Sequence, residues 1–464
     1  MRGTPEAPGT SGVPEARGAQ GRAGAPGAVR TAVVVGGGIG GLTAAVALHR
    51  RGVRVTVLER APSLEPVGAG ISLAPNSLRA LDTLGLGDEI RALAAWQGDG
   101  GVRTPGGRWL SRSSADAVAE RFGGPLVLLH RATLIDALAA RLPEGTVRTA
   151  ADTALVDPGD PGDPGRPARV RTAEGDETAA DLVVAADGIQ SAVRRALFPD
   201  HPGAVYAGFT TWRIVVPLPG VAFAAHETWG RGRIWGTHPL KDGRIYAYAA
   251  ALAPAGERAA DERAELLRRY GDWHDPIPAV LAATRPEDVL RHDVHHLAEP
   301  LPAFHRGRVA LLGDAAHAMP PTLGQGGNQA IEDAVVLAHH HTDLAAYSAA
   351  RLPRTTRIAR QAVRVSRLNL TAGRTAVAVR DTALSALSRI AGPALFLKGF
   401  DGIADWRPPQ DTPQDPAQIP PQDQSQGPAA GPTPGSGPVA GDRRGRPRML
   451  RSDDGGRTPE RLTD

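Results

Sequence analysis

The chain has 464 residues, of which 41% are hydrophobic and 22% charged, enough for two or three domains with a sizeable core. Its formal net charge is +4, and nearly all of its basic residues are arginines, since lysine occurs only as Lys241 and Lys398. The arginines are scattered and aromatics make up only 4%, so the composition does not favour a nucleic-acid binder. There is no cysteine, which excludes disulfides, thiolate metal sites, a cysteine nucleophile and a cysteinyl flavin link.

The sequence contains no long apolar segment. No apolar run approaches the roughly 20 residues of a membrane-spanning helix, and the N-terminus lacks the apolar stretch of a secretory signal. We therefore expect a cytoplasmic protein without an integral membrane segment. Residues 1–29 and 409–464 are rich in Pro and Gly. They are predicted to be disordered tails, because they cannot bury enough apolar surface to offset their ordering entropy.

The first ordered segment predicts a βαβ unit. It reads as a strand over 31–35, a glycine-rich turn, a helix over 42–51 and a strand over 53–58. In a G-x-G-x-x-G turn the first glycine permits the turn, the second lets a pyrophosphate approach, and the third lets helix and strand pack closely. The helix N-terminus then offers free N–H groups to the phosphates. The three glycines here are Gly36, Gly38 and Gly41.

An acidic residue at the end of the second strand indicates which nucleotide fits. Glu59 can accept hydrogen bonds from ribose hydroxyls, and its charge would repel a 2′-phosphate. The pattern thus favours FAD or NAD over NADP, with Arg60 beside it. The alternative interpretation of Glu59 is a surface carboxylate at a strand end.

Two further apolar runs, over 181–188 and 307–314, each end in Gly and Asp. Each is typical of a buried parallel strand whose carboxyl end meets a ligand. Asp314 can hold a ribityl or ribose hydroxyl, and the glycines after it free the backbone to approach a flat ring. A helix beginning beside that ring favours a flavin. The residues of this segment expected to lie against the flavin are Pro321, Gly324, Gly326, Gly327 and Asn328.

In combination, these motifs resemble those of the single-component FAD-dependent aromatic monooxygenases, the family of p-hydroxybenzoate, salicylate and urate hydroxylases. The similarity covers roughly residues 30–409. It implies an α/β fold: a doubly wound, Rossmann-like FAD-binding domain with an inserted β-sheet substrate domain and C-terminal helices. The matching stretches are "GGGIGG" (36–41), "GAGISLAPNSLRALDTLGL" (68–86), "RATLIDAL" (131–138), "ADGIQSAVR" (186–194), "GDAAHAMPPTLGQGGNQAIEDA" (313–334) and "DWRPP" (405–409).

The resemblance also implies domain boundaries. The FAD-binding domain is expected to span 30–204 and 301–345, the substrate domain 205–300, and the C-terminal helices 346–408. One departure concerns residues 339–342, a link shorter than is usual in the family, which leaves the packing of the last helices open.

By the same resemblance, Arg131 would contact non-covalent FAD, together with Gly70. Asp187 would lie near the pyrophosphate and the path of the nicotinamide cofactor, and Asp314 near the ribityl phosphate. Each of the first two has a structural alternative: Arg131 as a surface residue at a helix start, and Asp187 as a cap of the helix near Ser191.

The family uses NAD(P)H and O2 to hydroxylate or epoxidise a small molecule. No second glycine-rich dinucleotide unit is present, which agrees with transient binding of the reductant. In the β-rich region, Arg233 and Tyr246 match the residues expected near the substrate, and Arg213 and His238 are weaker candidates. An edge-strand charge and a core tyrosine explain the first two equally well. We expect no metal site, because the adjacent histidines at 339–341 face different directions on a helix.

Three other functions share part of these motifs. An FAD-dependent halogenase would need a catalytic lysine and a W-x-W-x-I-P stretch, neither of which is found where expected. An NAD-dependent dehydrogenase would explain residues 31–60 but not 313–334. A non-catalytic flavoprotein would keep the FAD motifs without turnover. The sequence does not distinguish NADH from NADPH, and it sets neither the substrate nor the oligomeric state.

Overall fold

The computed structural model describes residues 29–64, 69–96, 99–218, 220 and 223–410. These residues belong to one compact unit, 1–411, and the second unit, 412–464, lies outside the described residues. The predicted tails therefore fall almost entirely outside them as well. Within the described part, no helix is long and apolar enough to cross a membrane.

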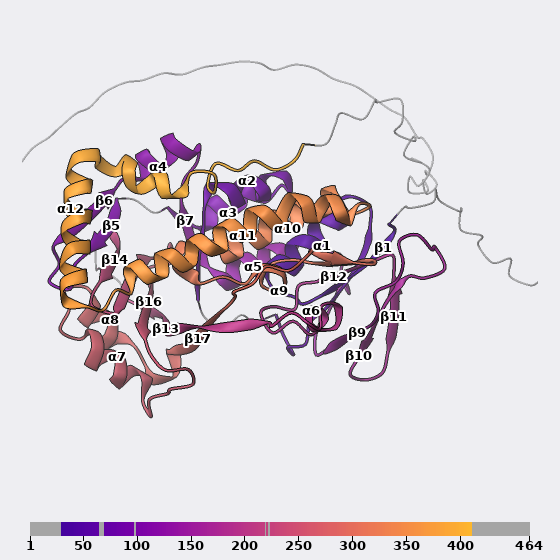
Figure 1. Cartoon of the computed structure of the whole chain (residues 1–464), viewed down its shortest axis with the longest axis horizontal. Helices are drawn as coiled ribbons and strands as arrows, with labels where there is room; N and C mark the ends of the chain where they lie inside the picture. Colours follow the sequence, from indigo (N-terminus) through magenta and orange to yellow (C-terminus); the bar gives the residue numbers. More distant parts are fainter. Residues whose placement is uncertain (1–28, 65–68, 97–98, 219, 221–222, 411–464) are drawn as a thin grey trace, which may run out of the picture. The chain divides into compact units, whose positions relative to one another are not determined.

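A six-stranded sheet forms the centre of one half of the molecule, on the right in Figure 1. Its strands are parallel except for the outer pair β18 and β19, which is antiparallel. The inner strands are continuous apolar runs, as expected where both faces are covered. In sheet order the strands are β18 (His305–Arg306), β19 (Val309–Leu311), β12 (Leu182–Ala185), β1 (Thr31–Val35), β2 (Arg54–Leu58) and β8 (Val147–Arg148).

Helices and a smaller antiparallel sheet pack against this six-stranded sheet. Helix α1 lies on β1 and β12 and also contacts α5 and α10, while α2 packs on α10 and on α3. Strands β9 (Thr153–Asp157), β10 (Ala168–Thr172) and β11 (Glu177–Ala180) form a separate antiparallel sheet, which contacts β1 and β12. The helices are α1 (Ile39–Arg50), α2 (Pro75–Thr83), α3 (Gly87–Leu93), α5 (Arg131–Ala139) and α10 (Gly326–His339).

A seven-stranded sheet forms the other half, on the left in Figure 1. It is antiparallel except where β14 lies parallel to β5. One face packs on α7 (Glu262–Tyr270) and α8 (Ile277–Ala283) through a core that includes Trp235 and Tyr270. In sheet order the strands are β17 (Leu290–Leu297), β13 (Ala204–Pro217), β16 (Arg244–Leu252), β15 (Arg233–Pro239), β14 (Ala225–Trp229), β5 (Gly100–Arg103) and β6 (Trp109–Ser113).

The second sheet therefore draws on two stretches of chain. Strands β5 and β6 come from residues 100–113, well before the boundary predicted at residue 205. A small sheet of β3 (Gly70–Leu73), β7 (Val127–His130) and β4 (Ala95–Trp96) lies near the opposite face from α7, where Ala69 and Leu128 pack with Tyr246.

The C-terminal helices follow the short link at 340–343. Helix α11 (Leu344–Asn369) packs on α10, and α12 (Arg374–Leu397) packs on β6. A buried ionic cluster joins α10 to α11: Arg351 pairs with Glu332 and Asp333, each at 2.6 Å. Burial disfavours the charge on Arg351, but the attraction of Asp333 and Glu332 outweighs it and raises the pKa of Arg351. Helix α11 is thus anchored to α10 by buried charge pairs.

Candidate functional site

The glycine-rich turn after β1 has different requirements at each glycine. Gly36 has φ +108°, and a Cβ there would lie 2.3 Å from the Ala186 carbonyl oxygen. A Cβ on Gly41 would lie 2.0 Å from the carbonyl oxygen of Gly36. A Cβ on Gly38, in contrast, would have only the Arg131 Nη2 within contact range, at 4.0 Å. Gly36 and Gly41 thus serve turn and packing, whereas Gly38 leaves open space at the start of α1.

Glu59 is held beside this turn by backbone donors. Its Oε2 accepts from the Gly37 N–H at 2.6 Å, and its Oε1 from the Ala61 N–H at 2.8 Å. The carboxylate therefore stands at the end of β2, next to the glycine turn, while Arg60 is exposed. Contact with a ribose stays a prediction.

Arg131 lies across the turn, at the first position of α5. Its Nε is buried and has no hydrogen-bond partner among the described residues. Burial lowers the pKa of Arg131, the charge of Arg213 adds to that effect, and Asp314 opposes it. An unpaired guanidinium opposite an open helix N-terminus is the electrostatic setting that a pyrophosphate fits.

One carboxylate oxygen of Asp187 accepts a hydrogen bond, and the other has no partner among the described residues. Its Oδ2 accepts from the Val193 N–H at 3.2 Å, and Ser191 Oγ accepts from the Arg194 N–H at 2.9 Å, so both residues cap α6 (Ala192–Leu197). The Oδ1 of Asp187 is buried without a hydrogen-bond partner in the described part of the chain. The capping alternative thus accounts for one oxygen of the carboxylate, and contact of the other with the cofactor stays a prediction.

Asp314 begins the single-turn helix α9 (Asp314–His317). The residue is exposed, and its Oδ1 lies 3.9 Å from the Cβ position of Gly326. The preceding Gly313 has φ +59° and donates its N–H to Asp333 Oδ2 at 2.9 Å, which fixes the turn that presents Asp314. The carboxylate therefore faces the first turn of α10.

The loop before α10 is tied to the small sheet. Gly324 has φ +63°, after a 3-10 turn that begins at Pro321, and a Cβ on Gly327 would lie 2.9 Å from Ile71 Cδ1. Asn328 Oδ1 accepts from the Ala74 N–H at 2.9 Å, and its Nδ2 donates to the carbonyls of Ser72 and Gly324 at 2.9 and 2.7 Å. The Asn328 side chain thus fastens α10 to β3, and its contact with a flavin stays a prediction.

We predict that Asp314→Ala weakens FAD binding roughly ten- to hundredfold. A charge-assisted hydrogen bond to the ribityl chain is worth about 1.5–3 kcal/mol. Glu59→Gln should weaken it less, because the amide oxygen still accepts one bond. Fluorescence titration of the flavin-free proteins measures both. Unchanged affinity in Asp314→Ala would leave Asp314 with a structural role only.

Three of the four predicted substrate residues share one face of the seven-stranded sheet. Tyr246 on β16 lies opposite His238 on β15, and its neighbour Tyr248 lies opposite Arg213 on β13. The His238 ring stacks on the Tyr248 ring at 5.7 Å between centroids. The Tyr246 ring lies 2.6 Å from the Cβ position of Gly70. This face therefore meets the small sheet that also supports the glycine loop of α10.

Arg213 brings a positive charge to this face. It is half-buried and has no carboxylate or hydrogen-bond partner among the residues the structure describes. Burial raises the pKa of Tyr246, and the charge of Arg213 opposes that rise. The charge of Arg213 also lowers the pKa of Arg131.

Arg233 lies on the other face, which corrects its predicted place beside Tyr246. It pairs with Ala251, an odd number of residues from Tyr246, and side chains alternate along a strand. Its guanidinium lies 5.4 Å from the Trp273 ring and 5.8 Å from the Tyr270 ring, under α7. Arg233 therefore packs against aromatic residues in the helix-covered core.

Two further polar residues on the site face, Tyr248 and Glu227, were not predicted from the sequence. The Tyr248 hydroxyl donates to Glu227 Oε1, and Trp229 Nε1 donates to Glu227 Oε2 at 2.7 Å. Burial raises the pKa of Glu227, and these two hydrogen bonds oppose the rise. Burial also lowers the pKa of His238 to about 4, so its ring is neutral at pH 7. The alternating "YAY" of β16 was the available signal for Tyr248, whereas Glu227 requires knowledge of strand pairing.

Comparison with known proteins gives a family and several relatives. The model of the FAD binding domain family matches residues 29–362. Aurachin C monooxygenase/isomerase of Stigmatella aurantiaca is 39% identical over 342 residues, covering 73% of this chain and 86% of the relative. The 3-amino-4-hydroxybenzoate 2-monooxygenase of Streptomyces cremeus is 35% identical over 357 residues, covering 72% and 86%.

A solved structure shows the same fold. Klebsiella pneumoniae HpxO complexed with FAD and uric acid superposes with a TM-score of 0.72 at 28% identity, over 80% of this chain and 97% of that one. A match of this length extends well beyond a single dinucleotide-binding unit.

Proposed function

The chain belongs to the FAD-binding-domain family of FAD-dependent monooxygenases, and on that premise we propose that it uses NAD(P)H and O2 to oxygenate a small aromatic or heteroaromatic compound. The observation that carries the proposal is that a candidate cofactor site and a candidate substrate site lie side by side. A cradle with unpaired polar groups for a dinucleotide lies next to a sheet face with Arg213 and Tyr246. We place the reaction in the cytoplasm, where NAD(P)H is supplied.

The residues of the cradle fit non-covalent FAD. Gly38 leaves room at the N-terminus of α1, and the Nε of Arg131 and Oδ1 of Asp187 have no partner among the described residues. Asp314 faces the start of α10, whose N-terminal N–H groups suit the polar edge of a flavin. Bound there, FAD supplies the redox chemistry by which O2 is activated and one oxygen atom is delivered.

The sheet face fits a substrate with a planar, electron-rich ring. Arg213 pairs with an anionic or enolised group, and the Tyr246 hydroxyl orients or exchanges a proton with a ring substituent. The rings of Tyr246 and Tyr248 supply the flat, apolar surface beside them. A carboxylated phenol or a purine-like heterocycle has this chemistry, and the chain's residues then serve to orient it and exclude water.

One experiment tests the proposal directly. Purified protein is expected to be yellow, to release FAD on heating or acidification, and to oxidise NAD(P)H faster when the right phenol or heterocycle is added. Mass spectrometry should then find one atom of 18O from labelled O2 in the product. Protein that takes up no FAD, or product without label, would overturn it.

We predict that Arg213→Ala weakens substrate-stimulated NAD(P)H oxidation, or diverts it to hydrogen peroxide, while FAD stays bound. Loss of a charge-assisted hydrogen bond corresponds to about ten- to hundredfold in substrate affinity. Arg233→Ala is the matched control, because its side chain lies on the opposite face of the same sheet. Coupling is measured as product formed per NAD(P)H consumed. Equal effects of the two substitutions would contradict the assignment of Arg213.

A further inference from the structure

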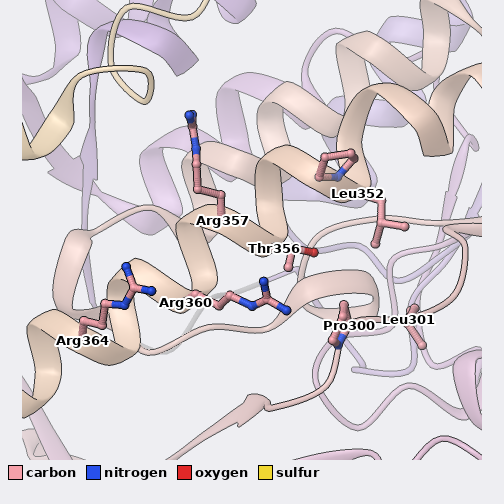
Figure 2. A pocket seen from close by; sticks show the side chains of 8 residues that line it. Pro300, Leu301, Leu352, Thr356, Arg357, Arg360 and Arg364 are labelled. Atoms are coloured by element: carbon pink, nitrogen blue, oxygen red, sulfur yellow. The ribbon is translucent and has the colours of Figure 1, made fainter.

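A groove lined by arginines lies along α11, apart from the site described above. Two adjoining cavities of about 520 and 310 Å³ run between α11 and the segment that follows β17. Both are lined by Pro300, Leu352, Thr356, Arg360 and Arg364. Figure 2 shows Arg360 extending from α11 towards Pro300, while Arg357 points away from that wall.

Five of the six arginines of α11 fall into two groups, and the sixth, Arg357, lines the larger cavity and donates to the Gly402 carbonyl. Those in its first half, Arg351 and Arg354, are neutralised by buried carboxylates. Those that line the groove further along, Arg360, Arg364 and Arg367, are exposed and form no ion pair within the described part of the chain. Three guanidiniums spaced by four and three residues share a helix face, so their charges converge on the groove. One carboxylate, that of Glu299, also belongs to a lining residue.

The position of the groove connects it with the proposed cofactor cradle. The smaller cavity, of about 310 Å³, is lined by Ala316, His317 and Ala318 at the end of the α9 segment. That same segment begins at Asp314, which faces Gly326 on the cradle side. A helix of four residues is therefore shared by the wall of the groove and the wall of the cradle.

We propose that the Arg360, Arg364 and Arg367 groove binds the phosphate groups of NAD(P)H. Convergent guanidiniums recognise phosphate oxygens by paired, charge-assisted hydrogen bonds. The cavity volumes lie in the range of small-molecule sites. The chain has no second glycine-rich dinucleotide unit, so the reductant needs an anchor of another kind. This inference rests on the proposed function, since it supplies the binding site for that reaction's electron donor.

The test compares two double variants with the same change in net charge. Arg360→Glu/Arg364→Glu reverses two charges in the groove. Arg374→Glu/Arg389→Glu reverses two exposed charges on α12, outside the groove. Calorimetric titration of the FAD-loaded proteins with NADP+ and NAD+ measures binding directly. Anaerobic stopped-flow reduction with increasing NADPH or NADH then gives a Kd and a limiting rate.

The groove variant is expected to raise the Kd of the nucleotide at least about tenfold, while FAD content and the limiting rate of reduction change less than about twofold. The control should stay within about threefold of the parent protein in Kd. The neutral variant Arg360→Gln/Arg364→Gln removes the two charges without reversing them, and it should raise the Kd of the nucleotide several-fold. Equal Kd values for groove and control variants would overturn the groove proposal while leaving the monooxygenase proposal intact. If neither NADPH nor NADH reduces the flavin of the parent protein, the proposed function is overturned, and the groove proposal with it.

Discussion

Replacing Arg351 by methionine is expected to destabilise the protein by about 3–5 kcal/mol, because the substitution breaks a buried ion-pair cluster. Methionine fills a similar volume but leaves two carboxylates, Glu332 and Asp333, fully buried and short of their partner. Arg354 still donates to Glu332 at 2.8 Å, and His317 still contacts Asp333. Neither side chain contacts both carboxylates, as Arg351 does. The loss is a large share of the roughly 5–15 kcal/mol typical of folded proteins.

The control for this prediction lies about two turns along the same helix. Arg357 is exposed and donates to the Gly402 carbonyl at 2.6 Å, so Arg357→Met should cost less than about 1 kcal/mol. Urea unfolding of the FAD-loaded proteins gives both values. A difference between the two variants below about 1 kcal/mol would show that the cluster is not required for stability. Because Asp333 also accepts from Gly313, Arg351→Met should lower FAD content as well.

Gly38→Ala is expected to reduce FAD affinity roughly ten- to hundredfold while the flavin-free protein keeps nearly its full stability. The added methyl group would meet no protein atom closer than the Arg131 Nη2 at 4.0 Å, and φ −73° at this position suits alanine. The group would instead occupy the space through which a pyrophosphate reaches the start of α1. Alanine is a poorer helix cap than glycine, which adds a cost of at most about 1 kcal/mol.

Gly41→Ala provides the comparison three residues away. Its Cβ would lie 2.0 Å from the Gly36 carbonyl oxygen, so α1 must move from β1 and the flavin-free protein should itself melt at a lower temperature. Thermal melting without FAD, followed by FAD titration, separates the two effects. Wild-type FAD affinity in Gly38→Ala would contradict the proposed path of the pyrophosphate. A large loss of stability in the same variant would mean that the open space serves the fold.

Much of the cofactor half of the molecule was predictable from the sequence, because its requirements are local. A strand, a turn with Gly36 and a helix with Gly41 close together only with glycine at those positions, and the order of residues records this directly. The family resemblance and the FAD-binding fold are confirmed by the family match over 29–362 and by the HpxO superposition. The helix predicted over 42–51 begins earlier, at Ile39, because the glycines belong to its first turn.

The substrate half was less predictable, because its contacts depend on strand register. Arg233 and Tyr246 lie near each other in sequence and on a common hairpin, yet a period of two residues sends their side chains to opposite faces. Glu227 reaches Tyr248 only because β14 pairs with β15, which in turn pairs with β16. The pairing of β5 with β14 joins residues more than 100 positions apart in the chain, and no local pattern marks it.

The features that could be read directly from the order of residues belong to short segments: the glycine turns, the acidic residues at strand ends and the absence of cysteine. Backbone sterics and hydrogen-bonding capacity act within a few residues, so they can be read in chain order. Which charged side chains have a partner depends instead on how the helices pack in three dimensions. The six arginines of α11 look alike in sequence, but burial against Glu332 and Asp333 neutralises Arg351, while Arg360 and Arg364 are left facing a groove. Electrostatic free energy depends on distance and burial in space, and neither is written along the chain.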